Sequence, residues 1–172
     1  MDPQIGCGHE KKVSPGTMSI YVYPNSKNIP LESRNPYITD LIKSLSAHEK
    51  VINKDKPTSL GLIDLLVKLP RTRYVIFSWI ENVVDKKGGI LQFFLFYLIS
   101  LLFKLTGRKM VFILHNKFSH SKTRMIWKKK IFGSVIRYSD HILTHSREGV
   151  RFIEKNYPGS AAKVFFLHHP VD

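Results

Sequence analysis

The chain has 172 residues, of which 43% are hydrophobic and 23% charged, so its composition is that of a globular domain and argues against an unfolded chain. Its 27 Lys and Arg residues outnumber its 13 Asp and Glu residues, and the net charge of +14 attracts polyanions such as nucleic acid, an anionic bilayer or a phosphorylated substrate. The single cysteine, Cys7, excludes an internal disulfide and fits a reducing compartment.

Residues 1–17 lack the apolar core of a secretory signal, and Met18 directly precedes the first strand-like segment. We interpret 1–17 as a leader or an expression remnant outside the fold, and 18–172 as one domain. The charges of 1–17 cancel, so the basic excess lies in 18–172.

From residue 18 onward, short β-branched or aromatic segments alternate with longer segments of helical spacing. The predicted strands are 19–23, 50–53, 74–79, 109–114, 141–144 and 163–167, and the predicted helices are 36–47, 60–69, 90–105, 122–138 and 146–156. This alternation predicts an α/β fold with a Rossmann-like doubly wound parallel sheet. Such sheets bind ligands at the carboxyl ends of their strands, which directs attention to 24–35, 79–85, 115–122, 145–146 and 168–169.

The predicted helix 90–105 is apolar around most of its circumference. A helix over this range would be roughly 24 Å long, whereas the hydrocarbon core of a bilayer is about 30 Å thick and needs a helix of ~20 residues. We expect a crossover helix that packs on the sheet, and an alternative is that its outer side also touches lipid.

On a helical wheel, the predicted helix 122–138 carries its hydrophobic residues on one broad face. The basic residues opposite it are Lys122, Lys129, Lys130 and Arg137, and those nearer its boundary are Arg124 and Lys128. A surface of this kind is either a solvated face or a site for an anionic membrane, to which each basic residue contributes ~1 kcal/mol. We predict membrane binding by Lys122, Arg124, Lys128, Lys129, Lys130 and Arg137.

Polar residues follow two buried strands at the expected crevice. His115 and Asn116 end one strand, His120 lies in the loop beyond, and Trp79 and Glu81 follow the preceding strand. An imidazole or a carboxylate can take a proton from a hydroxyl or hold it in place, Asn can both donate to and accept from a sugar, and Trp can stack on a sugar face. A single histidine of this kind is often structural, but the combination indicates a site.

The sequence predicts neither a metal site nor a bound cofactor in this chain. Its histidines have no Cys partners and no recognised ligand spacing. The loop 24–35 contains no glycine, which argues against a dinucleotide at the first strand, and there is no P-loop or nucleophile motif.

The ordered set of strand ends resembles the N-terminal domain of GT-B glycosyltransferases, close to family 4 members that build bacterial exopolysaccharide. The matching motifs are Tyr23-Pro24, Asn35-Pro36-Tyr37, Trp79-Ile80-Glu81, His115-Asn116 with His120, Asp140 to Ser146, and His169-Pro170. The resemblance covers most of 18–172. Two features of the family are different here, because Ser119 replaces a proline before the second histidine and the first loop has no glycines.

The resemblance implies an acceptor-binding half of a hexosyltransferase, inactive alone, on the cytoplasmic face of the membrane. The acceptor would be a lipid-linked or membrane-borne glycan, and the nucleotide-sugar donor would bind mainly a C-terminal domain that is absent from this chain. His115 and Glu81 would be catalytic, with acceptor contacts from Asn116, His120, Trp79, Asn35, Arg34 and Ser146.

Two alternatives remain open at this point. The chain could be a non-catalytic subunit that recruits a separate donor-binding chain to the membrane. It could also bind nucleic acid, which its charge allows, although no RNA- or DNA-binding motif is visible and no nucleic-acid partner is expected.

Overall fold

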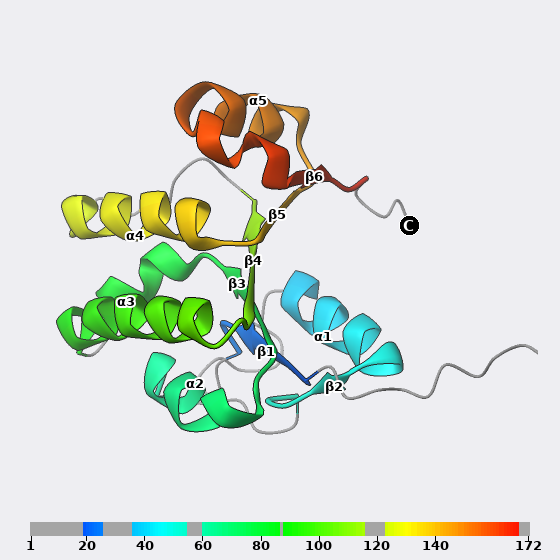
Figure 1. Ribbon diagram of the computed structural model, residues 1–172, viewed down its shortest axis with the longest axis vertical. Coiled ribbons are helices and arrows are strands. Elements are labelled where there is room, and N and C mark those ends of the chain that lie inside the picture. The colour runs from blue at the N-terminus through cyan, green and yellow to red at the C-terminus, as the bar shows by residue number, and fades with distance from the viewer. Residues whose placement is uncertain (1–18, 26–35, 55–59, 87, 116–122, 169–172) are drawn as a thin grey trace, which may run out of the picture.

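The computed structural model describes residues 19–25, 36–54, 60–86, 88–115 and 123–168. The described strands form one six-stranded, all-parallel sheet of order β2-β1-β3-β4-β5-β6 (Figure 1). The strands are β1 (Ser19–Tyr23), β2 (Lys50–Val51), β3 (Tyr74–Ser78), β4 (Lys109–Leu114), β5 (His141–Thr144) and β6 (Val164–Phe166). The predicted α/β fold with a Rossmann-like parallel sheet is confirmed.

The helices alternate with these strands as the sequence predicted. They are α1 (Pro36–His48), α2 (Leu62–Lys68), α3 (Gly89–Leu105), α4 (Met125–Tyr138) and α5 (Arg147–Asn156), and three short 3-10 helices are η2 (Leu69–Arg71), η3 (Ile80–Asp85) and η4 (Pro158–Lys163). All eleven predicted strands and helices are therefore present among the described residues, with ends that differ by three residues or fewer.

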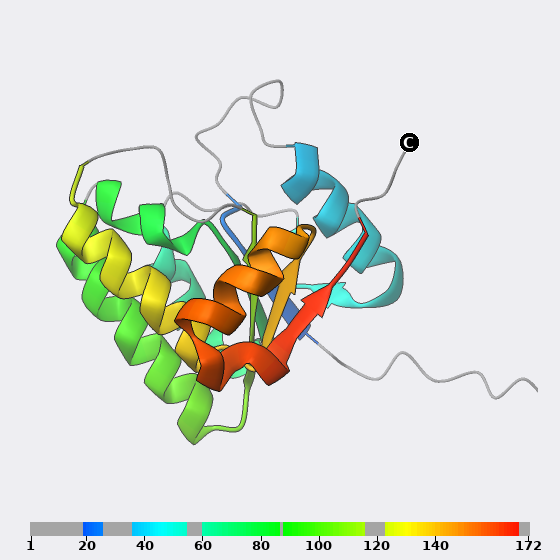
Figure 2. The same ribbon diagram turned by 90° about the horizontal axis from the view of Figure 1, so that it is seen from above.

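Two layers of helices enclose the sheet. The helix α1 lies on one face, and α2, α3, α4 and α5 lie on the other (Figures 1 and 2). Right-handed crossovers explain this division, because the chain moves from β1 to β2 in one direction and from β2 through β3 to β6 in the other. The strand order reverses between β1 and β3, and the crevice at such a switch point is where doubly wound sheets bind ligands.

Strand alternation divides the core between the two faces. Phe77, Phe112 and Ile142 pack under α3 and α4, whereas Ile76 and Ile113 pack under α1. The larger core therefore lies on the α3–α4 side of the sheet.

No described helix is long and apolar enough to cross a membrane. Helix α3 is seventeen residues long and rests on the sheet through Phe96, Ile99 and Phe103, each 0% exposed. Its inner face is thus part of the core.

Candidate functional site

Four ring side chains meet at the carboxyl end of the sheet, beside the switch point. Trp79 stacks on His115, with ring centroids 4.1 Å apart and an interplanar angle of 12°. Tyr37 meets His115 edge-on at 4.5 Å and His145 at 5.6 Å. We call Tyr37, Trp79, His115 and His145 the ring cluster.

Alternation along the strands places the two histidine rings on the face that α1 covers. Ile113 of β4 and Leu143 of β5 are neighbours in register and point to that face, so the residues two positions later, His115 and His145, point the same way. Their ring centroids are 6.3 Å apart. Ordinary sheet geometry therefore brings together two histidines that are thirty residues apart in the chain.

Trp79 reaches the ring cluster through an unusual backbone conformation. Its φ of 48° is left-handed, which is uncommon for a bulky residue and is found most often where function constrains the chain. The following residues turn away into η3, and the indole stays over the end of the sheet against His115.

Hydrogen bonds define the state of His145 and Tyr37. Nδ1 of His145 lies 3.0 Å from the carbonyl oxygen of Leu167, so Nδ1 carries the proton and donates it. Nε2 then accepts from the Tyr37 hydroxyl, 3.0 Å away. Burial raises the pKa of Tyr37, which keeps this hydroxyl protonated.

A buried hydroxyl lies on the same face at the end of β3. Ser78 is 0% exposed, and its Oγ makes no hydrogen bond to any described residue. Leaving such a hydroxyl unsatisfied costs about 1–3 kcal/mol. The ring cluster itself combines aromatic faces with imidazole and phenol groups, a combination suited to a sugar.

Glu81 lies in η3, which packs against α3 and α4, whereas His115 follows β4 and stacks on Trp79. Burial raises the pKa of Glu81, an effect that its own backbone hydrogen bond and the charge of Lys128 partly offset. Its neighbour in charge is therefore Lys128 and not the ring cluster.

Ser146, another predicted acceptor-binding residue, follows His145 in the chain and is the N-cap of α5. Its Oγ accepts hydrogen bonds from the backbone N–H groups of Glu148 and Gly149, which caps the helix. The predicted positions Arg34, Asn35, Asn116, His120 and Lys122 lie outside the described residues.

One predicted membrane-binding residue is placed differently. Lys128 is 1% exposed and forms an ion pair with Asp85, so the prediction that it belongs to an exposed basic face is wrong. The helical wheel put it near the boundary of the hydrophobic face, and η3 covers that boundary. The remaining described basic positions, Arg124, Lys129, Lys130 and Arg137, are exposed.

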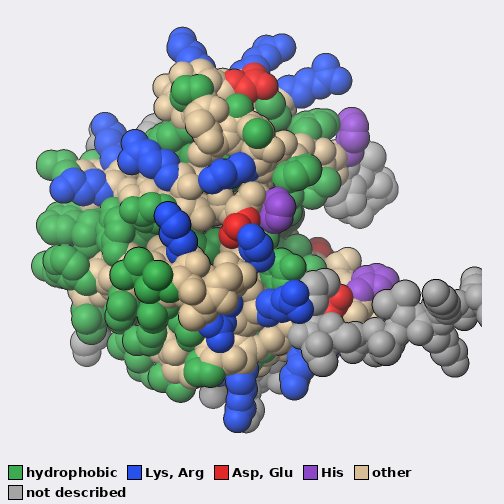
Figure 3. Space-filling model, in the orientation of Figure 1, with side chains coloured by type: hydrophobic (Ala, Val, Ile, Leu, Met, Phe, Trp, Pro, Cys, Tyr) green, Lys and Arg blue, Asp and Glu red, His purple; other side chains and the backbone are tan. Residues whose placement is uncertain are grey.

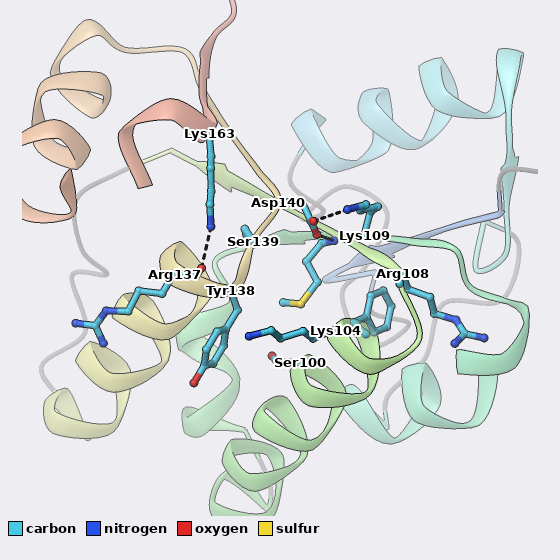
Figure 4. Close-up of a pocket in the computed structure, with 12 residues that line it drawn as sticks. Ser100, Lys104, Arg108, Lys109, Arg137, Tyr138, Ser139, Asp140 and Lys163 are labelled. Atoms are coloured by element: carbon cyan, nitrogen blue, oxygen red, sulfur yellow. Dashed lines mark hydrogen bonds and ion pairs between the residues drawn. The ribbon is translucent and has the colours of Figure 1, made fainter. Parts of the chain in front are cut away.

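A cavity lies at the opposite edge of the sheet, where the strands begin (Figure 4). This cavity of about 410 Å³ is lined by five basic residues and one acidic residue: Lys104, Arg108, Lys109, Arg137, Lys163 and Asp140. Most of the cations have other roles. Lys163 donates to the carbonyl of Arg137, Arg108 donates to the carbonyl of Thr72, and Lys109 pairs with Asp140 at 2.8 Å.

Helix polarity accounts for the basic character of this edge. Crossover helices of a parallel sheet all end at the edge where the strands begin, so their negative ends gather there and favour cations. Lys104 and Arg137 lie in the last turns of α3 and α4. We therefore assign this cavity a structural role and place the candidate site at the ring cluster.

Two members of the ring cluster were not predicted as site residues. Tyr37 appeared only as part of a helix start and His145 only as a strand-end position. The sequence did contain a signal for His145, because it directly follows β5 just as His115 directly follows β4. Among the described residues, no group of three or more His, Cys, Asp or Glu side chains could hold a metal ion.

No protein-family model matches the chain, and no curated protein sequence is significantly similar to it.

Proposed function

We propose that this chain is the acceptor-binding domain of a glycosyltransferase that transfers a sugar from a nucleotide sugar to a lipid-linked or membrane-borne glycan. The observation that carries the proposal is the ring cluster at the carboxyl ends of β3, β4 and β5, beside the switch point of a Rossmann-like sheet. Sugar sites combine flat aromatic surfaces with side chains that both donate and accept hydrogen bonds, and Tyr37, Trp79, His115 and His145 provide these.

In this proposal, His115 holds a hydroxyl of the reacting sugar. If the reaction inverts the configuration at the anomeric centre, His115 is also the base that removes the acceptor proton. If the reaction retains that configuration, His115 only positions the sugar. Tyr37 and Trp79 limit the rotation of the His115 ring by contacts at 4.5 and 4.1 Å. Because Glu81 lies beside Lys128 in the packing of η3 against α4, we retain His115 and not Glu81 as the group at the reacting sugar.

The nucleotide sugar would bind mainly a second, C-terminal domain, and the chain itself would need no cofactor. The acceptor half alone should then bind glycans without transferring sugar. This separation of roles makes glycan binding by this chain the direct test.

The test is ligand-detected NMR of the chain with short oligosaccharides, comparing the parent protein with His115→Ala. We expect His115→Ala to lose the signal while keeping its circular dichroism spectrum. His141→Ala is the matched control, because His141 is an exposed histidine at the other end of β5. Equal binding by His115→Ala and the parent would refute the site.

A second candidate is a non-catalytic subunit that brings a separate donor-binding chain to the membrane. The exposed apolar side of α3 favours it, since such a surface serves recruitment without any catalysis. Sugar transfer by the assembled complex separates the two, because His115→Ala abolishes transfer only if the ring cluster acts on the sugar.

A further inference from the structure

Helix α3 exposes a continuous apolar stripe. Its exposed side chains are Ile90 at 59%, Leu91 at 53%, Phe94 at 59%, Leu98 at 44%, Leu101 at 53% and Leu105 at 72%. Their spacing of three and four residues keeps them on one side of the helix along its whole length of roughly 25 Å. Contiguous apolar surface of this extent is rare on a soluble monomer and marks a binding surface.

Helix α4 extends the stripe sideways. Ile126 is 71% exposed and Trp127 36% exposed, and the Trp127 ring meets Phe93 of α3 edge-on at 4.6 Å. Near the other end of the pair, Tyr138 of α4 lies 6.4 Å from Tyr97 of α3. We call the six exposed α3 residues together with Ile126 and Trp127 the α3–α4 apolar surface.

Helices α3 and α4 contribute basic and no acidic side chains to the rim of this surface. No Asp or Glu occurs between Lys86 and Ser139, whereas Lys104, Lys129 and Lys130 are exposed on the same two helices. Figure 3 shows hydrophobic side chains gathered over α3 and α4, with Lys and Arg side chains beside them on the α4 side. An ordinary solvated helix face would mix the two signs.

We propose that the α3–α4 apolar surface docks on an anionic lipid bilayer, with its apolar side chains at the acyl boundary and its basic rim among the headgroups. Helices that lie in the interface combine an apolar side with flanking Lys and Arg, and Trp and Tyr prefer the same depth. The surface does not span the bilayer, because the opposite side of α3 is buried against the sheet.

Charge decides between lipid and a second copy of the chain. Two copies meeting through this surface would bring two basic rims together, which opposes association. Anionic headgroups neutralise the same rim and add to the apolar contribution. The docking surface is independent of the glycan site, and it supplies the partner that a membrane-borne acceptor requires.

The experiment is co-sedimentation of the chain with vesicles of phosphatidylcholine and phosphatidylglycerol in equal parts, against vesicles of phosphatidylcholine alone. We expect strong binding to the mixed vesicles, weakened by salt, and little to the neutral ones. The triple variant Phe94→Gln, Leu98→Gln and Leu101→Gln should bind the mixed vesicles at least about 100-fold more weakly.

The rim is tested by removing three positive charges in two places. Lys104→Gln, Lys129→Gln and Lys130→Gln should weaken binding about 100-fold, at a tenfold loss for each 1.4 kcal/mol and ~1 kcal/mol per charge. The matched control removes the same charge from α5 through Arg147→Gln, Arg151→Gln and Lys155→Gln, all exposed, and should bind nearly as the parent does.

Three outcomes would overturn the proposal. One is parent-like binding by either variant of the surface, and another is an equal loss in the α5 control. The third is a parent protein that ignores the vesicles but dimerises by light scattering, with the apolar variant monomeric, which would assign the surface to a second copy. His115→Ala should bind vesicles like the parent, so loss of the glycan site and loss of the docking surface are told apart.

Discussion

Helices α3 and α5 cover the same face of one sheet, yet they present different surfaces to solvent. Each buries hydrophobic side chains on its inner side, Phe96 and Phe103 in α3 and Ile153 in α5. The outer side of α5 mixes the charged residues Arg147, Glu148, Arg151, Glu154 and Lys155, whereas the outer side of α3 is apolar. Since α5 shows that a crossover helix here packs without outer apolar residues, the outer side of α3 is not explained by folding.

The largest expected loss of stability comes from a substitution on the inner side of α3, and the same substitution on its outer side should have little effect. Phe96→Ala should lower the free energy of unfolding by about 4 kcal/mol, because Phe96 is fully buried between Phe77 and the rest of the core. Phe94→Ala, the same change two residues away at a 59% exposed position, should change it by less than about 0.5 kcal/mol. Urea denaturation measures both.

A large loss in Phe94→Ala would break the comparison, since the outer side of α3 would then contribute to folding. Equal and small losses in both variants would show that α3 is loosely packed.

The next effect tests the same division on α4. Lys128→Met should lower stability by about 3 kcal/mol, because it removes the partner of Asp85 and leaves buried Glu81 without a nearby positive charge. Lys129→Met, one residue along and exposed, should be close to neutral in folding. If the two variants unfold at the same urea concentration, the Lys128–Asp85 pair contributes nothing.

Much of this architecture was predictable from the sequence. Alternation of β-branched runs with helical spacing locates every described strand and α-helix, because burial on both faces of a parallel sheet leaves a strong periodic signal. The strand-end rule also located His115 and Trp79. Neither prediction needs long-range contacts.

The rest depends on contacts between distant residues. The helical wheel of 122–138 cannot show that η3 covers Lys128, since that contact joins segments some forty residues apart. Likewise Glu81 follows Trp79 by two residues, but Glu81 lies in η3, which packs against α3 and α4, whereas Trp79 stacks on His115. Tyr37 joins the ring cluster only because α1 crosses back over the sheet to place its first turn beside β4 and β5.

A smaller effect compares how α3 and α5 begin. Ser146→Ala removes the side chain that caps α5 and should cost about 1 kcal/mol in thermal or urea unfolding. At α3 the corresponding position is Gly88, whose φ of 71° favours glycine, so Gly88→Ala should cost about 1 kcal/mol through backbone strain instead.

The two losses have different origins, which Ser146→Asp distinguishes. Asp also caps helices, so it should restore the stability that Ser146→Ala loses. Because Ser146 was predicted to contact the acceptor, glycan binding provides a second measurement: a stable Ser146→Asp that fails to bind would show a role for Ser146 beyond capping.

The smallest expected effect concerns pH and the inner side of the α3–α4 layer, where charge is buried beneath an apolar exterior. Burial raises the pKa of Glu81 above its ordinary value of 4.5, so the folded state holds this proton more tightly than the unfolded chain does. Stability from this group is therefore present at low pH and is lost as pH rises through the unfolded pKa toward the folded one. Glu81→Gln should accordingly be slightly more stable than the parent at pH 7, and the two should converge below pH 4.5.

The pKa of Asp140, at the edge of the sheet where the strands begin, is shifted in the opposite direction to that of Glu81. Burial acts to raise its pKa, but hydrogen bonds from Lys109 and the backbone N–H of Met110 outweigh it and hold the pKa below the ordinary value. Asp140→Asn should therefore lose stability at neutral pH and match the parent in acid. Urea unfolding across this pH range checks both the Glu81 and the Asp140 variants.

A Glu81→Gln variant that is less stable than the parent at pH 7 would mean that attraction to Lys128 exceeds the cost of burying the Glu81 carboxylate. The inner side of the α3–α4 layer would then be stabilised by charge as well as by packing.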